Sequence, residues 1–310
     1  MKDKKLSILV PIYGTEKYIA NCAHSLFRQN YDNIEYIFVN DCTKDNSIEI
    51  LNQVILQYPK VKDKVKIINH EKNFGLARSR LTGINNATGD YIWCIDSDDC
   101  IDEHALDILK KYLINDFDML FFDYTVSSLK CNNAIRRNKI SVKSLLSMRT
   151  PYPIWSVIIK RALIVRNKIY PIEGIDFSED YVMVSRLIVS CKNYINIHKT
   201  LYYYNVMNPA SYMHNIDKNK IYQSCVGALN VYTFLKKERK GLSAFYYYIA
   251  LRYIQLYRVE KNLPIFYELS NCMYSINYLL TFILISLRDS KNYDRLLKVY
   301  RVIVCRVLDF

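Results

Sequence analysis

Residues 91–99 read YIWCIDSDD, and this stretch decides both the class of fold and the place of its site. It begins as an apolar run that suits a buried strand, and it ends with Asp96, Asp98 and Asp99 crowded together. Carboxylates this close repel one another, so the arrangement costs free energy unless a cation or hydrogen-bond donors offset it. We therefore expect the end of this strand to bind something.

Strand and helix patterns alternate on either side of this stretch. The expected strands lie at residues 6–10, 34–39, 64–69, 91–95 and 118–126. The expected helices lie at residues 15–29, 45–58, 75–87, 102–114, 155–165 and 178–189. Strands that are apolar on both faces and separated by helices are typical of a parallel sheet covered on both sides. We therefore expect an α/β fold with a doubly wound, mostly parallel sheet.

Helical patterns rich in Tyr, Leu and Lys dominate from about residue 217 onward. We place a domain boundary near residue 215, which separates a first domain at 1–215 from a smaller, helical C-terminal region at 216–310. That region holds 15 Lys and Arg against 7 Asp and Glu, so it carries +8 of the net charge of +13. Such a basic region indicates an anionic partner, for example phosphate groups, nucleic acid or an anionic membrane surface.

The carboxyl ends of parallel strands lie along one edge of a sheet, and ligands bind at that edge. In this chain those ends carry Pro11 and Tyr13, Asp41, His70 and the cluster at 96–99. These residues therefore converge in space although long segments separate them in the sequence. We expect the ligand site at this edge.

Three interpretations compete for the carboxylates of the cluster. A calcium loop of the EF-hand type needs Gly at its sixth position and Glu at its twelfth, but Ile101 and Asp107 stand there, which excludes it. An acidic helix start fits Asp102 well but explains Asp96 poorly, because Asp96 ends a strand at the ligand edge. A Mg²⁺ or Mn²⁺ ion that serves a phosphate ligand explains the cluster best.

The sequence contains no glycine-rich loop for phosphates. The turn after the first strand holds Gly14 alone, and the G-x-x-x-x-G-K-[ST] pattern of P-loops is missing. Asp41 would suit a ribose contact in a dehydrogenase, but the glycines of that fold are missing too. We therefore expect a metal, bound by carboxylates of the cluster at 96–99, to hold the phosphates.

Five stretches, taken together and in order, resemble one family. They are SILVPIYGTEKYI (7–19), IFVNDCTKDNS (37–47), NFGLARSRLTGINNATGDYIWCIDSDD (73–99), PIWSVIIKRALI (153–164) and FSEDYVMVSRLI (177–188). This ordered set, which spans roughly residues 5–205, resembles the family 2 glycosyltransferases with the GT-A fold.

The resemblance implies a glycosyltransferase that uses a nucleotide-sugar donor, with a UDP-sugar as the first candidate, and a divalent metal, Mn²⁺ or Mg²⁺. It implies transfer with inversion to a glycan or a polyprenyl-diphosphate-linked acceptor in surface polysaccharide synthesis. Matched position by position, the implied roles fall on Pro11, Tyr13 and Arg80 in the donor site, Asp41 at the base, Asp96 at the ribose and metal, Asp98 on the metal and Asp180 as catalytic base.

Some of these roles stay open on the residues alone. Glu179 and Asp180 fit an acidic first helical turn as well as they fit the carrier of a catalytic base. His214 lies near where related enzymes close over the donor diphosphate, which makes it a candidate phosphate or metal contact. The chain also departs from the family pattern, since Asn40 replaces the first acid of the usual DDGS, Leu81 follows Arg80 in place of Asn, and Val157 stands where Lys is common.

Partners and location are inferred from composition. Residues 269–287 carry no charge and approach the length of a membrane span, yet their Ser and Asn residues favour a buried or interfacial helix. The nine Cys show no zinc spacing, which indicates a reduced, cytoplasmic protein. It could lie peripherally on the inner face of the cell membrane.

Several alternatives concern the partners and the function. The basic region at 216–310 is either an acceptor or membrane contact or an ordinary helical pack with solvated charges, and both interpretations stay open. Nucleic-acid binding is not expected, because no matching module is present. The alternative to an enzyme is a catalytically inactive nucleotide-binding or scaffolding protein with the same fold.

Overall fold

The computed structural model describes residues 4–127, 132–135, 140–148, 150, 153–209, 216–260, 263–276 and 281. The chain divides into two compact units. The sheet unit comprises Met1–Asn138, Pro153–Gly174 and Ser190–His214, and the helical unit comprises Lys139–Tyr152, Ile175–Val189 and Asn215–Phe310. The units are interleaved in the sequence, because two segments before residue 190 join the helices after residue 215.

A mixed sheet, nine-stranded over the described residues, forms the centre of the sheet unit. Its strands are β1 (Leu6–Ile12), β2 (Ile34–Asn40), β3 (Val65–Asn69), β4 (Tyr91–Cys94), β5 (Cys100–Ile101), β6 (Met119–Ser127), β7 (Asn132–Ile135), β8 (Val157–Lys160) and β9 (Tyr194–Asn205). They follow the order β3-β2-β1-β4-β8-β6-β9-β5, with β7 paired to β6. Strands β3, β2, β1 and β4 are parallel, whereas β8 runs antiparallel to both β4 and β6. The expected α/β layout is confirmed.

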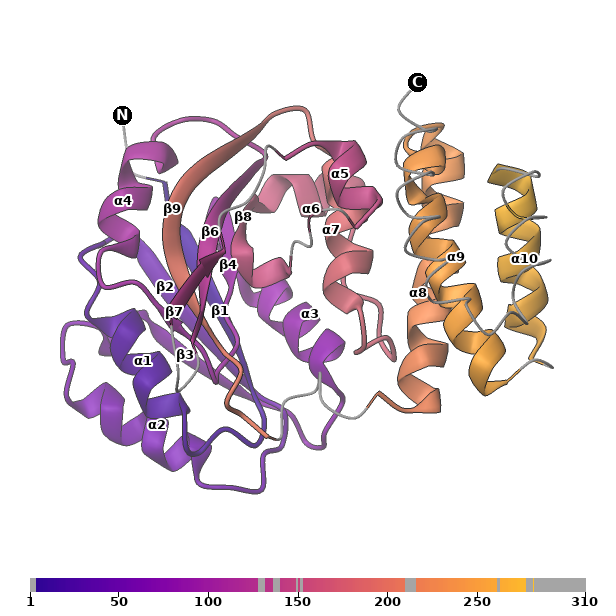
Figure 1. Ribbon diagram of the computed structural model, residues 1–310. Helices are drawn as coiled ribbons and strands as arrows, with labels where there is room; N and C mark the ends of the chain where they lie inside the picture. Colours follow the sequence, from indigo (N-terminus) through magenta and orange to yellow (C-terminus); the bar gives the residue numbers. More distant parts are fainter. Residues whose placement is uncertain are drawn as a thin grey trace. The chain divides into compact units, whose positions relative to one another are not determined.

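Helices cover both faces of the parallel strands (Figure 1). They are α1 (Ile19–Phe27), α2 (Ser47–Leu56), α3 (Leu76–Asn86), α4 (Ala105–Leu113) and α6 (Arg161–Asn167). Along β1, Ile8 and Val10 enter the core that α1, α2 and α4 close, while Leu9 points to the other face. There a Cβ built on Gly83 of α3 would lie 3.4 Å from Leu9 Cβ, so α3 packs close against the strand. With both faces covered, the strand ends remain for ligand binding.

One expected helix is partly wrong. The apolar pattern of residues 155–165 predicts a helix, but residues 157–160 form strand β8, and α6 begins only at Arg161. Ile159 pairs with Ile92 on β4 and with Met119 on β6, so this segment fills the gap between two strands. Its run of β-branched residues suits a buried strand as well as a helix, and the neighbouring strands decide between them.

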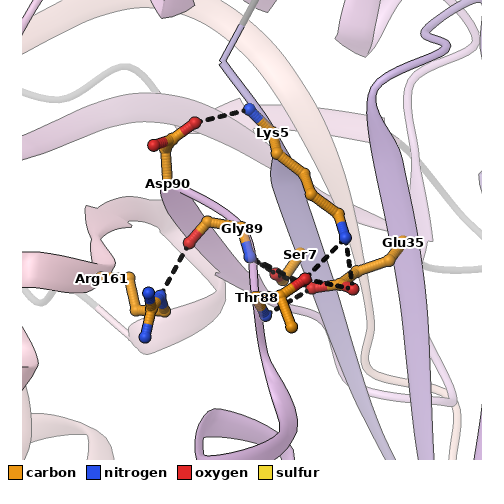
Figure 2. A network of polar contacts seen from close by, with 7 residues as sticks. All are labelled: Lys5, Ser7, Glu35, Thr88, Gly89, Asp90 and Arg161. Atoms are coloured by element: carbon orange, nitrogen blue, oxygen red, sulfur yellow. Dashed lines mark hydrogen bonds and ion pairs between the residues drawn. The ribbon is translucent and has the colours of Figure 1, made fainter.

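A polar network ties the strands together at the amino ends of β1 and β2 (Figure 2). The Glu35 carboxylate accepts hydrogen bonds from Lys5 Nζ at 2.8 Å, Ser7 Oγ at 2.5 Å and Thr88 N–H at 2.7 Å. Burial alone would raise the pKa of Glu35, but these hydrogen bonds outweigh it and lower that pKa to about 2. A Cβ on Gly89 would lie 2.5 Å from Ser7 Oγ, so the turn before β4 can approach this closely only with glycine.

The helical unit contains α5 (Val142–Leu146), α7 (Glu179–Ser190), α8 (Lys218–Glu238), α9 (Leu242–Val259) and α10 (Pro264–Ile276). The last residue of α7, Ser190, is assigned to the sheet unit. Aromatic rings join α7 to α9, where Tyr181 and Tyr248 stack with centroids 3.9 Å apart. Of the apolar stretch at 269–287, the structure describes residues 269–276 and 281, and the first part belongs to α10. Within the described residues, no helix combines the length and the apolar character that a membrane crossing requires.

Candidate functional site

The carboxyl edge of the parallel strands gathers most of the predicted site residues. Pro11 is buried within β1, and Tyr13 directly after this strand is 51% exposed. Asp41 follows β2, and Asp96 follows β4 by two residues. The structure therefore confirms that these positions share one edge of the sheet, as the parallel order requires.

Asp41 joins the end of β2 to the loop before α3. Only 3% of Asp41 is exposed, and its Oδ1 accepts from Phe74 N–H at 2.9 Å and lies 2.7 Å from His70 Nδ1. Its Oδ2 accepts from Gly75 N–H at 2.8 Å. His70 Nε2 lies 2.9 Å from Thr82 Oγ1, which holds the ring in place. A carboxylate oxygen has two lone pairs, so Oδ2 is the oxygen of Asp41 that can accept a further donor.

Arg80 and Asp96 form a shielded ion pair. Arg80 lies on α3, its side chain is 2% exposed, and its Nη2 lies 2.7 Å from Oδ1 of Asp96, whose side chain is 26% exposed. The low exposure of the arginine strengthens the attraction relative to a pair in open water. Arg80 therefore fixes the Asp96 carboxylate and offsets part of the negative charge of the cluster.

Asp99 is a buried carboxylate whose two oxygens both accept hydrogen bonds from the chain. Tyr202 O–H donates to Oδ2 at 2.6 Å, and Asn205 N–H donates to Oδ1 at 2.7 Å. Burial, together with the charges of Asp98 and Asp96, raises the pKa of Asp99 well above its usual range. These contacts give Asp99 a part in holding the loop in shape.

Asp98 is half-buried and differs from Asp99 in its surroundings. Its Oδ2 accepts from Asn208 Nδ2 at 2.8 Å, and its backbone carbonyl accepts from Asn205 Nδ2 at 3.2 Å. Burial and the neighbouring charge of Asp96 raise the pKa of Asp98. A nearby cation would remove this penalty, because it favours the charged form of both carboxylates.

The end of β9 and the turn after it brace the whole cluster. Tyr202 and Asn205 donate to Asp99, and Asn208 donates to Asp98. Trp155 stacks on Tyr202 with centroids 4.4 Å apart. Sequence reasoning missed Tyr202, Asn205 and Asn208, whereas it placed His70 at this edge without giving it a role. A signal for the two asparagines is their place at and shortly after the end of the aromatic run Tyr202–Tyr204.

Asp180 lies in the helical unit, in the first turn of α7. It is half-buried, and its Oδ1 accepts from Tyr181 N–H at 2.6 Å. The residue before the helix, Ser178, has a φ of 69°, which is uncommon for a non-glycine residue. His214 lies outside the described residues. Asp102, expected to cap a helix, accepts from His104 N–H at 2.9 Å just before α4.

The carboxylates of the edge fit a divalent cation that shares its shell with phosphates. Among the described residues, no group of three or more His, Cys, Asp or Glu could hold a metal by itself. Mg²⁺ and Mn²⁺ sites in phosphate-binding proteins commonly need only one or two carboxylates, because phosphate oxygens and water complete the shell. Asp98 and Asp96 supply such a pair, whereas the two oxygens of Asp99 already accept hydrogen bonds.

Known proteins resemble this chain in sequence and in fold. The family model described as "Glycosyl transferase family 2" matches residues 7–170. An uncharacterized glycosyltransferase of Haemophilus influenzae is 29% identical over 266 residues, which cover 83% of this chain and 98% of that protein. Glycosyltransferase GlyG of Streptococcus pneumoniae is 37% identical over 106 residues. The match covers 34% of this chain and 34% of GlyG, and the match to GlyA of the same organism covers 15% of GlyA.

Solved structures share the fold at low sequence identity. The structure of S. aureus TarS 1–349 in complex with UDP-GlcNAc has a TM-score of 0.72 and 17% identity, and the match covers 98% of this chain and 91% of that one. Mannosyltransferase PcManGT of Pyrobaculum calidifontis, in complex with GDP-Man and Mn²⁺, has a TM-score of 0.58 and 14% identity, over 98% and 87% of the two chains. The fold is the GT-A fold, and the chain belongs to glycosyl transferase family 2.

Proposed function

We propose that the protein is a metal-dependent, inverting glycosyltransferase. It moves a sugar from a nucleoside-diphosphate donor, with a UDP-sugar as the first candidate, to a hydroxyl of a glycan or lipid-linked glycan in surface polysaccharide synthesis. The observation that carries this proposal is the pair Asp96 and Asp98 at the carboxyl edge, one held by Arg80 and the other by Asn208. The nucleotide-sugars bound to TarS and PcManGT support the class of donor.

The donor is proposed to lie along the sheet edge. The exposed ring of Tyr13 offers a face for stacking of the base, and Oδ2 of Asp41 can accept an N–H of the base. Asp96, oriented by Arg80, faces the ribose. When bound, a divalent cation held by Asp98 and Asp96 would neutralise charge on the departing diphosphate.

Asp180 is proposed as the general base. It takes the proton of the acceptor hydroxyl while the acceptor oxygen forms a bond to the anomeric carbon. The bond from this carbon to the diphosphate oxygen breaks in the same step, so the nucleoside diphosphate leaves with the electron pair. Attack from the face opposite the leaving group inverts the anomeric configuration. The proton ends on the Asp180 carboxylate, and each bond formed is balanced by a bond broken.

The acceptor is proposed to approach the basic C-terminal helices. Residues 216–310 carry a net charge of +8, which suits a diphosphate linkage or the anionic inner face of the cell membrane. Peripheral association with that face is part of the proposal. Liposome sedimentation with and without anionic lipid tests it, and equal binding to neutral and anionic vesicles would contradict it.

Asp98→Asn provides the test of the enzymatic function. Purified protein is screened against nucleotide-sugars with Mn²⁺, and release of nucleoside diphosphate is measured. We expect turnover by the wild type to require the metal. We expect Asp98→Asn to lose at least about a hundredfold, since Asp98 would hold the cation that neutralises the leaving-group charge. Asp102→Asn is the matched control, because Asp102 lies close in the sequence but its carboxylate accepts from His104 N–H and Tyr203 O–H just before α4.

The alternative function, a catalytically inactive nucleotide-binding or scaffolding protein with the same fold, predicts a different result. It would show thermal stabilisation by a nucleoside diphosphate without turnover of any donor, and Asp98→Asn would then leave the turnover measurement unchanged. No metal-dependent turnover by the wild type with any donor would contradict the proposed function.

A further inference from the structure

Arg252 on α9 is a buried cation without an acidic partner among the described residues. Arg252 is 7% exposed, its Nη1 donates to Gln255 Oε1 at 2.7 Å, and its Nη2 donates to Ser178 Oγ at 3.3 Å. Its Nε is buried and has no hydrogen-bond partner in the described part of the chain. The guanidinium carbon lies 4.5 Å from the ring centroid of Tyr248.

Stability does not explain this arginine. Taking a guanidinium out of water is unfavourable, and replacing a buried charge by a well-packed apolar side chain is often neutral or stabilising. An amide, a hydroxyl and an aromatic face offset only part of the cost. A group that the fold holds at such a cost needs another explanation, and its position beside α7 suggests one.

Ser178 links Arg252 to the start of α7. Its side chain accepts from Arg252, while its backbone carbonyl accepts from Val182 N–H at 3.0 Å in the first turn of the helix. Ser178 has a φ of 69°, which is costly for a residue with a Cβ and persists only where other contacts hold it. Glu179 and Asp180 follow directly in the first turn of α7. The orientation of the Asp180 side chain therefore depends on the backbone conformation of Ser178.

The charge of Arg252 also acts on this corner of the helical unit. The ring of Tyr248 lies under the guanidinium, and both Arg252 and Asp180 influence the pKa of its hydroxyl, which burial raises. Arg252 likewise opposes the rise that burial causes in the pKa values of Tyr181 and Cys225. Arg252 is thus the positive charge that acts on Tyr248, Tyr181 and Cys225 in the part of the chain that the structure describes.

We infer that Arg252 is a positioning residue for Asp180, which it serves by anchoring Ser178 at the start of α7. The inference rests on the proposed role of Asp180 as general base. It assigns to the C-terminal helices a part in the reaction, through a residue outside the stretches that resemble the family.

Arg252→Met tests the anchoring without any assay of activity. Methionine replaces the guanidinium by an apolar group of similar length, and amide hydrogen exchange is measured across α7. We expect the protection of the Val182 amide to fall roughly tenfold, as the loss of a charge-assisted hydrogen bond predicts, while amides late in α7 keep their protection. Arg258→Met is the matched control, since it removes an exposed cation from the same helix.

Kinetics then test whether the anchored group is the base. We expect kcat of Arg252→Met to fall roughly tenfold with the KM for the donor unchanged. We expect Arg252→Lys to recover part of this loss, because it keeps a cationic hydrogen-bond donor for Ser178. A fall in kcat with a proportional rise in the donor KM would contradict the positioning role. The positioning role would also be contradicted if Arg252→Lys lost as much kcat as Arg252→Met while the exchange of the Val182 amide stayed unchanged.

The two arms separate this inference from the proposed function. Unchanged exchange at Val182 overturns the inference whatever the activity. Reduced protection in a protein whose wild type turns over no donor supports the anchoring of α7 and contradicts the enzymatic proposal. If Arg252→Met does not fold, Ser178→Ala replaces it, because this variant removes the acceptor of the same hydrogen bond and leaves the guanidinium in place.

Discussion

Glu35→Gln tests how the amino ends of the strands are held together (Figure 2). The pKa of Glu35 falls from 4.5 to about 2 in the folded chain, because hydrogen bonds from Lys5, Ser7 and Thr88 outweigh the effect of burial. At about 1.36 kcal/mol per pKa unit, this difference sets an upper bound of about 3 kcal/mol on the contribution of the charged form. The side chains of Lys5 and Glu35 are 34% and 17% exposed, and solvent screening reduces the figure to about 1–2 kcal/mol.

The sign follows from the lowered pKa. A carboxylate with a lower pKa in the folded state stabilises the fold above its unfolded pKa, and this stabilisation is lost as the pH falls through the folded pKa. The contribution of Glu35 is therefore complete above about pH 4.5 and disappears between about pH 4.5 and 2. Glutamine keeps one acceptor oxygen for the Thr88 and Gly89 amides but brings no charge to Lys5.

Urea denaturation at several pH values provides the assay. Both tryptophans of the chain, Trp93 and Trp155, lie in the sheet unit, so their fluorescence reports its unfolding. We expect Glu35→Gln to lower the free energy of unfolding by about 1–2 kcal/mol at pH 7 and by much less at pH 3. Glu49→Gln is the control, because Glu49 is exposed on α2. A Glu35→Gln deficit that stays constant from pH 7 to pH 3, or no deficit at pH 7, would refute the reasoning.

Two further predictions concern the brace around the aspartates. Tyr202→Phe removes the 2.6 Å hydrogen bond to Asp99, and we expect urea denaturation at pH 7 to show a free energy of unfolding lower by about 1–3 kcal/mol. An unchanged free energy of unfolding would show that Asp99 does not need this donor. Asn208→Ala removes the donor to Asp98, and we expect calorimetry with UDP present to show Mn²⁺ binding weakened roughly tenfold, whereas equal affinity would separate Asn208 from the metal site.

Much of the site could be predicted because it depends on local patterns. Asp41 and Asp96 each follow an apolar run, and parallel strands place such positions on one edge regardless of the distance in sequence between them. The alternation of strand and helix up to residue 100 is also local, since each apolar face is visible within one element. Strand β8 escaped this reasoning because Val157–Lys160 are apolar on both sides, and only pairing with β4 and β6 separates a strand from a helix there.

The sequence by itself determined the α/β class, the edge that carries the site and the family to which the chain belongs. The tertiary structure decided how the neighbouring aspartates differ. Asp98 and Asp99 are adjacent and chemically identical, yet Tyr202 and Asn205 enclose one, while the other stays half-buried beside Asn208. These partners come from β9 and the turn after it, about a hundred residues further along the chain. The contact of Arg252 with Ser178 likewise joins residues that lie far apart in the sequence. A pattern within one segment cannot show such contacts, because burial and hydrogen bonding depend on which distant residues the fold brings together.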